Sequence, residues 1–409
     1  MEVVHARCCG LDVPKDTVVA CLLTPGSGGR PTAEVRTFGT LTDELLALGD
    51  WLAEAGCTHV AMESTGVYWK PIWNVLEGQV ALLLANAQHI KRVPGRKTDV
   101  QDAEWIADLL RHGLLTASFV PDRAQRELRE LTRYRLALVR ERSREVQRVQ
   151  KTLEGANIKL GSVATDIMGK SGREILAGLA AGRADAAALA DLAQGQLRKK
   201  LPELERALVG RFGAHQRFLV ARQLAHLDEL DGLIAEVSAE IAERVRPCED
   251  AVTRLDGIPG VGRTTAEVRV AEIGTDMTRF PTDAHLASWA ALCPGHHESA
   301  GKRTSGKTRK GNRALRTALV EAAKAARRTR GTYRGAHYQR LAARRGPNTA
   351  AIAVAHSILI IAYHLLKDRG TYDDLGADFF DRRDQDALER RLVRRLEALG
   401  NKVTVEKVA

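Results

Sequence analysis

The sequence predicts an α/β domain followed by an all-α region. Over residues 6–115, short apolar or β-branched runs alternate with amphipathic stretches at helical spacing, which is typical of a mixed sheet with helices on its faces. From residue 123 to 246 the chain is almost entirely helix-forming. Pro121 and Pro247 mark the ends of this middle part. We therefore predict four segments, which are residues 1–120, 121–247, 248–370 and a charged tail at 371–409.

The first segment contains the elements of the predicted sheet. β-branched and apolar runs predict strands at 8–12, 17–24, 33–38, 59–63 and 79–85. Amphipathic spacing predicts helices at 41–55 and 67–76. Acidic residues end two of the strands, and two more lie in a later helix. This arrangement is that of an RNase H-like (RuvC-like) nuclease fold.

Four acids in this segment form a candidate metal site. Asp99 and Asp102 are three residues apart, so a helix directs both carboxylates the same way. Like charges in one small volume repel, and a hard divalent cation relieves that repulsion. With Asp12 and Glu63 at strand ends, the set is typical of one or two Mg²⁺ ions in phosphodiester chemistry. The alternative is structural, with Asp99 as a helix cap and Asp102 in an acid-friendly first turn.

The helical middle segment contains two patterns of interest. Leu227, Leu230, Ile234, Val237 and Ile241 follow the 3-4-3-4 spacing of a coiled-coil seam, which predicts self-association. An ordinary amphipathic helix packing inside its own domain is the alternative. The Arg-rich helix at 126–153 either follows a nucleic-acid backbone or presents a solvated charged face.

The third segment opens on a glycine-rich turn. Residues 255–266 resemble a helix-hairpin-helix motif, in which glycines permit a tight turn and backbone N–H groups of the second helix hold a phosphate. A glycine-rich turn between packed helices is the alternative. Further helices are expected at 313–327 and 350–366, and the second is apolar enough to be a buried helix. The tail is expected to be a helix plus a loose end.

Charge and cysteine usage limit the possible partners and compartment. The net charge is +11 and the pI about 9.5, which favours a polyanionic partner. Residues 296–345 carry 15 Lys or Arg against 2 Asp or Glu. Aromatic residues are only 4%, so phosphate contacts should dominate over base stacking. The six cysteines show no CxxC spacing, and the N-terminus has no signal-peptide form, so we expect a reducing cytosol and no membrane.

The basic loop at 295–311 contains a candidate nucleophile. Ser299 and Ser305 lie among cations that could neutralise phosphate and stabilise an alkoxide. A flexible basic loop with incidental serines is the alternative, because the loop has neither a Gly-x-Ser-x-Gly elbow nor Ser-His-Asp spacing. The residues expected to bind nucleic acid are Lys302, Arg303, Lys307, Arg309, Lys310, Asn312, Arg313 and Arg316.

Several motifs, in order, resemble the insertion-sequence 110 (IS110) family of transposases, also called bridge-RNA-guided recombinases. They are the four acids with Lys97-Thr98-Asp99-x-x-Asp102-Ala103, Leu255-x-Gly-Ile-Pro-Gly-Val-Gly-x-x-Thr-Ala, Ala290-Ala291-Leu292-Cys293-Pro294, Glu298-Ser299-Ala300-Gly301-Lys302 and Thr308-x-Lys310-Gly311-Asn312-x-x-Leu315-Arg316. The resemblance covers residues 6–366.

The resemblance implies roles for particular residues. The family's RuvC-like acids correspond to Asp12, Glu63, Asp99 and Asp102, and its catalytic serine corresponds to Ser299. Here Glu precedes the serine and Ala follows it where the family usually has Gln or Ser and Gly, which leaves Ser305 as a competitor. The resemblance also implies Mg²⁺, donor and target DNA, a structured non-coding bridge RNA and a homo-oligomer that assembles from dimer to tetramer.

We therefore expect a transposase of a mobile element, acting in the prokaryotic cytoplasm at the nucleoid. It would cut and rejoin DNA through a serine–DNA linkage. Two alternatives remain open. One is a hydrolytic, structure-selective nuclease of the junction-resolving kind, in which the acids activate water. The other is a non-catalytic nucleic-acid-binding scaffold.

Overall fold

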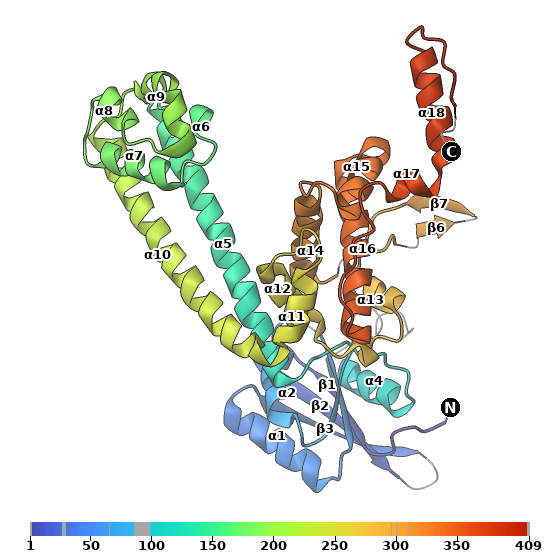
Figure 1. The fold of residues 1–409 in the computed structure, drawn as a ribbon. Helices are drawn as coiled ribbons and strands as arrows, with labels where there is room; N and C mark the ends of the chain where they lie inside the picture. The colour runs from blue at the N-terminus through green and yellow to red at the C-terminus, as the bar shows by residue number, and fades with distance from the viewer. Residues whose placement is uncertain are drawn as a thin grey trace. The chain divides into compact units, whose positions relative to one another are not determined.

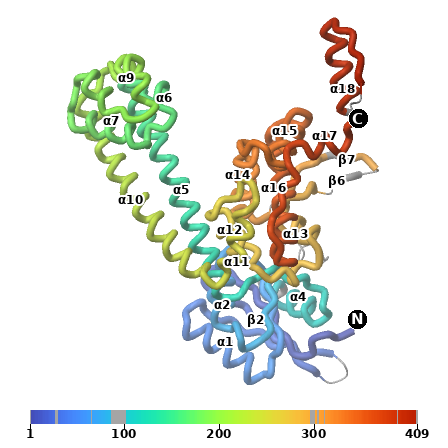
Figure 2. The backbone as a smooth tube through the Cα atoms, in the orientation of Figure 1, coloured from blue at the N-terminus to red at the C-terminus, as the bar shows by residue number. Residues whose placement is uncertain are grey.

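The computed structural model describes residues 2–26, 30–64, 66–85, 99–295, 297–299, 301–309 and 311–406 (Figures 1 and 2). Within these ranges, side chains are described except at 99–101, 297–299, 303–304 and 387. The chain divides into two compact units, Met1–Pro121 and Asp122–Ala409.

The first unit is built on a five-stranded mixed sheet, as the sequence predicts. The strands are β1 (Cys8–Asp12), β2 (Thr17–Pro25), β3 (Pro31–Gly39), β4 (His59–Glu63) and β5 (Ala81–Ala85). Their order in the sheet is β3-β2-β1-β4-β5. β1 pairs antiparallel with β2 and parallel with β4, and β4 pairs parallel with β5. The predicted strands are therefore all present, with ends displaced by up to two residues.

Helices cover both faces of this sheet. Alternating residues of β1 point to opposite faces, so Cys9 and Leu11 join the core under the first two helices. Cys8 joins a second core with Ala103 and Ile106 of a third helix. The helices are α1 (Thr42–Glu54), α2 (Trp69–Leu76) and α4 (Asp99–Arg111). The helix expected at 67–76 begins two residues later than predicted.

The second unit begins with a long antiparallel helical hairpin, α5 (Arg123–Gly155) and α10 (Ala214–Val245). Polar contacts join the two helices along their length. Glu127 accepts a hydrogen bond from Arg244 at 2.6 Å, Arg142 donates to Asp231, and Thr152 lies 3.4 Å from Gln223. Short helices cap the hairpin (Figure 2) and enclose a small apolar core. These helices are α6 (Leu160–Val163), α7 (Lys170–Ala180), α8 (Ala186–Ala190), the 3₁₀ helix η2 (Gly195–Lys200) and α9 (Leu201–Leu208).

The predicted coiled-coil seam lies on α10. Leu227, Leu230 and Ile241 are buried within this chain, and Leu227 shares a core with Val149 of α5. Ile234 and Val237 are only half-buried. Intrachain packing therefore occupies much of the seam, and self-association remains a prediction.

Helices of different lengths follow α10 and, together with a β-hairpin, form the rest of the second unit. They are η3 (Arg246–Cys248), α11 (Glu249–Asp256), α12 (Arg263–Ile273), η4 (Met277–Arg279), α13 (Asp283–Trp289), α14 (Arg313–Ala326), α15 (Tyr333–Arg345), α16 (Pro347–Asp368), α17 (Phe379–Arg383) and α18 (Gln385–Glu397). α16 is long and apolar enough to span a membrane by length and composition. Side chains along it are buried, including Val354, Ile358 and Leu359, so it serves as a core helix, as predicted.

Candidate active site and nucleic-acid interface

Glycine at position 10 lets α4 lie directly on β1. A Cβ atom at Gly10 would come within 2.3 Å of the Ala103 carbonyl oxygen and of the Ala107 amide nitrogen. No side chain fits there, so the helix and strand backbones are in contact. The Cys8 thiol contacts the Ala107 carbonyl oxygen at 3.7 Å, and Val4 N–H donates to the Arg111 carbonyl at 2.9 Å.

These contacts set the direction of α4. Moving along the chain from Val4 to Gly10 in β1 means moving along α4 from Arg111 back to Ala103. The helix is therefore antiparallel to the strand. Its first turn, with Asp99 and Asp102, lies toward the end of β1 that carries Asp12.

The sheet register adds a further acid at the same end. β1 and β4 are parallel, and Leu11 is paired with Met62. The next residues of the two strands are Asp12 and Glu63, and neighbours in a parallel register point to the same face. That face is the one covered by α4, because Ala61 shares the α4 core while Met62 lies in the other. The fold thus brings the end of β1 with Asp12, the end of β4 with Glu63 and the first turn of α4 to one end of one face.

The chemistry of this set suits a hard divalent cation. Carboxylate oxygens are the donors that Mg²⁺ prefers, and Asp12, Glu63 and Asp102 are half-buried, where they remain accessible. Among the residues that the structure describes, no three His, Cys, Asp or Glu side chains form a group able to hold a metal ion. The Asp99 side chain is not among those described. The metal site therefore remains a prediction that the backbone arrangement supports.

The predicted serine loop is a β-hairpin. β6 (His297–Ser299) pairs antiparallel with β7 (Lys302–Ser305), and Ser299 is in register with Lys302. Gly301 has a φ of +73°, a conformation that glycine adopts readily in a tight turn. Ser299 is thus next to the turn, and Ser305 pairs with His297 at the other end. The sequence analysis described this segment only as a basic loop and did not predict that these residues pair with one another.

The predicted nucleic-acid-binding residues differ in their surroundings. Lys302, Lys307, Arg309 and Arg313 are exposed, and Arg316 is half-buried. Arg309 donates a hydrogen bond of 2.7 Å to the Ser288 hydroxyl. Lys310 lies outside the described residues, as does the Arg303 side chain.

Asn312 is engaged within the protein at both side-chain atoms. Its Oδ1 accepts from the Leu315 N–H at 3.0 Å, which caps α14, and its Nδ2 donates to Glu272 at 2.5 Å. These contacts give Asn312 a structural role. A role in nucleic-acid binding remains a prediction.

The glycine-rich turn joins α11 to α12, as the helix-hairpin-helix motif predicts. Gly260 has a φ of +88°, and a Cβ there would come within 2.4 Å of the Ala322 carbonyl of α14. Packing therefore requires glycine at this position. Gly262 and Thr264 at the start of α12 are exposed, and Arg263 makes a two-hydrogen-bond pair with Glu249 at 2.6 and 2.8 Å.

Two family models match the chain in separate ranges. Residues 9–158 match the DEDD transposase model of IS110, described as "Transposase". Residues 252–339 match the model described as "Transposase IS116/IS110/IS902 family". The chain belongs to the IS110 family of transposases.

The matched ranges of this IS110 family transposase contain its candidate sites. The first holds Asp12, Glu63, Asp99 and Asp102, and the second holds the glycine-rich turn and the hairpin with Ser299. A curated protein from Streptomyces coelicolor, "Insertion element IS110 uncharacterized 43.6 kDa protein", is 36% identical over 122 residues. That match covers 29% of this chain and 29% of the curated protein.

The transposase also contains a buried ionic network on α12, which sequence reasoning missed. Glu272 is fully buried and accepts two hydrogen bonds from Arg133, at 2.7 and 2.8 Å, and one from Asn312. Glu267 pairs with Arg135 at 2.8 Å and with Arg263 at 3.0 Å. The sequence feature that could have predicted this network is the presence of charged residues within the otherwise apolar stretch 266–273.

Arg269 of the same helix is fully buried, and its three guanidinium nitrogens have no hydrogen-bond partner among the described residues. Burial lowers its pKa to about 9, so it remains protonated at neutral pH. A buried charge without a partner costs free energy of folding.

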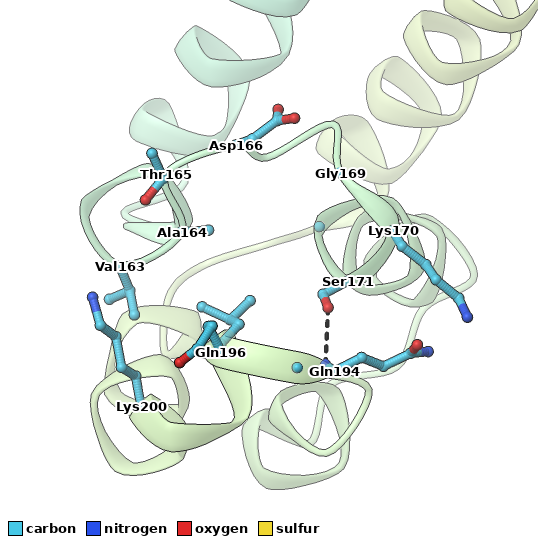
Figure 3. A pocket seen from close by; sticks show the side chains of 13 residues that line it. Val163, Ala164, Thr165, Asp166, Gly169, Lys170, Ser171, Gln194, Gln196 and Lys200 are labelled. Atoms are coloured by element: carbon cyan, nitrogen blue, oxygen red, sulfur yellow. Dashed lines mark hydrogen bonds between the residues drawn. The ribbon is translucent and has the colours of Figure 1, made fainter. Parts of the chain in front are cut away.

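A separate cavity of about 530 Å³ lies in the cap of the helical hairpin (Figure 3). One hydrogen bond joins two of its lining residues, from the Gln194 N–H to the Ser171 hydroxyl at 2.9 Å (Figure 3). The Gln194 side chain also donates at 2.9 Å to Glu174, which does not line the cavity. Asp166 and Lys170 line the same cavity, so its wall carries both signs of charge.

Proposed function

We propose that the protein cuts and rejoins DNA as the transposase of a mobile insertion sequence. The observation that carries this proposal is the placement of Asp12, Glu63 and the start of α4 at one end of one sheet face. Membership of the IS110 family of transposases supports it.

The first unit is proposed to be RNase H-like. Its strand order, β3-β2-β1-β4-β5, with the first three strands antiparallel and the last pairings parallel, supports this assignment. Acids at the ends of β1 and β4 and in a helix on the same face are the corresponding catalytic positions.

Asp12, Glu63, Asp99 and Asp102 would hold one or two Mg²⁺ ions. When bound, Mg²⁺ would polarise the scissile phosphate and stabilise the charge that develops on it. The carboxylates would fix the ions at the carboxyl ends of β1 and β4. The close Gly10 contact holds α4 firmly against β1 there.

Ser299 is the proposed nucleophile. Its hydroxyl oxygen would attack phosphorus and form an ester with one DNA end, while the phosphorus–oxygen bond to the other end breaks. That other end would leave as a hydroxyl after taking up a proton. Attack on the ester by the hydroxyl of a new strand would rejoin the DNA without ATP, because the ester conserves the bond energy.

The exposed cations around the hairpin would hold the nucleic-acid backbone. Lys302, Lys307 and Arg309 follow Ser299 directly and could neutralise phosphates on either side of the reacting group. A structured non-coding RNA that selects the donor and target DNA, and a dimer that assembles to a tetramer, complete the proposal. Localisation at the nucleoid follows from these partners.

The rival proposal is a hydrolytic nuclease in which Ser299 only contacts phosphate. Denaturing electrophoresis of labelled element-end DNA incubated with Mg²⁺, protein and the transcribed non-coding RNA separates the two. We expect a protease-sensitive DNA–protein adduct that is lost in Ser299→Ala and retained in Ser305→Ala. Cleavage without any adduct would support the nuclease, and an adduct lost only in Ser305→Ala would identify the other serine.

The four acids are tested in the same assay. Asp12→Ala, Glu63→Ala, Asp99→Ala and Asp102→Ala should each abolish cleavage, because removal of one ligand disrupts the metal geometry. Full Mg²⁺-dependent cleavage by Asp102→Ala would contradict the four-acid site. Binding of the RNA without cleavage by the unaltered protein would favour a scaffold.

A further inference from the structure

A cavity of about 880 Å³ opens at the base of the serine hairpin, within the second unit. The hairpin is closed there by a bridge between Pro294 and Thr308, and the Gly295 N–H donates to the Lys307 carbonyl at 2.9 Å. Pro294 and Thr308 both line the cavity. The segment that carries Ser299 and Ser305 therefore starts and ends at the cavity wall.

The charge of the wall favours an anionic occupant. Lys307, Arg309 and Arg316 line the cavity, and none of the lining residues that the structure describes is acidic. The cavity in the cap of the helical hairpin differs, since Asp166 lines it together with lysines. Guanidinium and ammonium groups on one wall suit a phosphate.

An apolar part of the wall favours a ligand that carries an apolar group in addition to a phosphate. Leu292, Leu341 and Ile352 line the cavity from the end of α13, α15 and α16. Its volume falls within the roughly 300–1,000 Å³ typical of small-molecule sites. A flat apolar group with a phosphate attached would use both parts of the wall.

Polar side chains between these parts can recognise the edge of a base. Asn348 and Ser357 line the cavity, as do His337 and His356. The His337 ring lies 5.7 Å from that of Phe380, and its Nδ1 is buried with no hydrogen-bond partner among the described residues. Burial lowers the pKa of both histidines, so each is neutral at pH 7 and offers one donor and one acceptor nitrogen.

We propose that this cavity binds one unpaired nucleotide of the nucleic-acid partner, with its base against Leu341 and Ile352 and its phosphate against Lys307 and Arg316. The occupant must be unpaired because a base stacked in a duplex cannot enter a concave site. The inference rests on the proposed action on nucleic acid and adds a nucleotide contact at the base of the hairpin that carries the proposed nucleophile.

The first experiment measures binding of thymidine and deoxyadenosine monophosphates to the full-length protein by calorimetry. Inorganic phosphate is the comparison probe. We expect either nucleotide to bind about tenfold or more tightly than phosphate, since base contacts typically contribute a factor of this order. Equal binding of phosphate and nucleotides would reduce the cavity to a basic patch and overturn the proposal.

Ala353→Trp is the principal variant, because Ala353 lines the cavity and is half-buried. A tryptophan there would fill the space of the base while all three cations remain. The matched control is Ala343→Trp, at an exposed position of α15 that does not line the cavity. Ala353→Trp should remove the preference for nucleotides, and Ala343→Trp should keep it. If Ala353→Trp fails to fold, Asn348→Ala serves instead and should weaken nucleotide binding several-fold, with phosphate binding unchanged.

The second experiment uses a single-stranded oligonucleotide with one 2-aminopurine, whose fluorescence rises when the base leaves its stack. Binding should raise the fluorescence for the unaltered protein and for Ala343→Trp, but not for Ala353→Trp, while fluorescence anisotropy shows that all three bind the strand. An equal rise for all three would overturn the proposal. A change of oligomeric mass in Ala353→Trp, with nucleotide binding retained, would assign the cavity to a second copy of the chain.

The adduct assay keeps this inference separate from the proposed function. Nucleotide binding that depends on Ala353, in a protein that never forms an adduct, would refute the serine mechanism alone. An adduct formed by the unaltered protein, together with nucleotide binding no tighter than phosphate binding, would refute the nucleotide site alone.

Discussion

Two sets of acids in this protein lie in different surroundings. In the first unit, Asp12, Glu63 and the start of α4 meet at the half-exposed end of a sheet face. On α12 of the second unit, Glu267 and Glu272 are buried and each is bonded to arginines. Residue spacing in the sequence does not distinguish the acids of the sheet from those of α12. Burial does, and guanidinium groups saturate the carboxylates of Glu267 and Glu272, which leaves these two no capacity for a metal ion.

The largest expected effect on stability is at Glu272. Glu272→Ala leaves the guanidinium of Arg133 and the amide of Asn312 without their buried acceptor. We expect the free energy of unfolding of the second unit to fall by about 3–5 kcal/mol, the usual cost of removing one partner of a buried pair. Urea denaturation followed by circular dichroism measures it.

The control for Glu272→Ala is Glu236→Ala, at an exposed position of α10. It should change the free energy of unfolding by less than about 0.5 kcal/mol. If Glu272→Ala lowers the free energy of unfolding no more than Glu236→Ala does, the ion pairs of α12 contribute little to folding. The acids of α12 would then not differ in this respect from those at the strand ends of the first unit.

At Arg269, by contrast, we expect a substitution to raise the free energy of unfolding. Arg269→Met replaces a buried, unpartnered guanidinium by an apolar side chain of similar length. We expect the free energy of unfolding to rise by about 1–4 kcal/mol, because the desolvation cost is removed. A marked destabilisation in the same urea experiment would mean that Arg269 has a partner essential for folding.

Buried thiols make the first unit sensitive to high pH. Burial raises the pKa of Cys8 to about 12 and those of Cys21 and Cys57 to about 11, from an ordinary value near 9. The folded state therefore holds these protons more tightly than the unfolded state. This contribution to stability is complete below pH 9 and is lost as the pH rises toward 11–12.

Tryptophan fluorescence tests this dependence, since four of the five tryptophans, Trp51, Trp69, Trp73 and Trp105, belong to the first unit. The urea midpoint from fluorescence should fall between pH 9 and 11, and Cys21→Ala should make the fall shallower. An identical pH dependence for Cys21→Ala would exclude Cys21 as a contributor.

The smallest expected change is at Asp102. Asp102→Ala removes one of several negative charges near the carboxyl ends of β1 and β4. The free energy of unfolding should therefore change by less than about 0.5 kcal/mol, and any change should be an increase. Thermal unfolding at low salt without divalent ions measures it. A loss comparable to that of Glu272→Ala would show that Asp102 is a structural acid like those on α12.

The sequence by itself determined the strands, most helices and the positions of the four acids, because these depend on local hydrophobic periodicity and on which residues follow a strand. Residue spacing also identified the glycine-rich turn. It did not show that residues 297–305 form a hairpin, since such short strands carry little periodic signal.

Only the tertiary structure decided how these parts are used. The seam on α10 packs partly on α5, and Asn312 holds Glu272, although its position in a basic loop predicted a nucleic-acid contact. The close packing of α4 on β1 depends on the absence of a side chain at Gly10, a contact between segments about 95 residues apart. Such pairings depend on which surfaces meet after folding, and a linear pattern of residues does not contain that information.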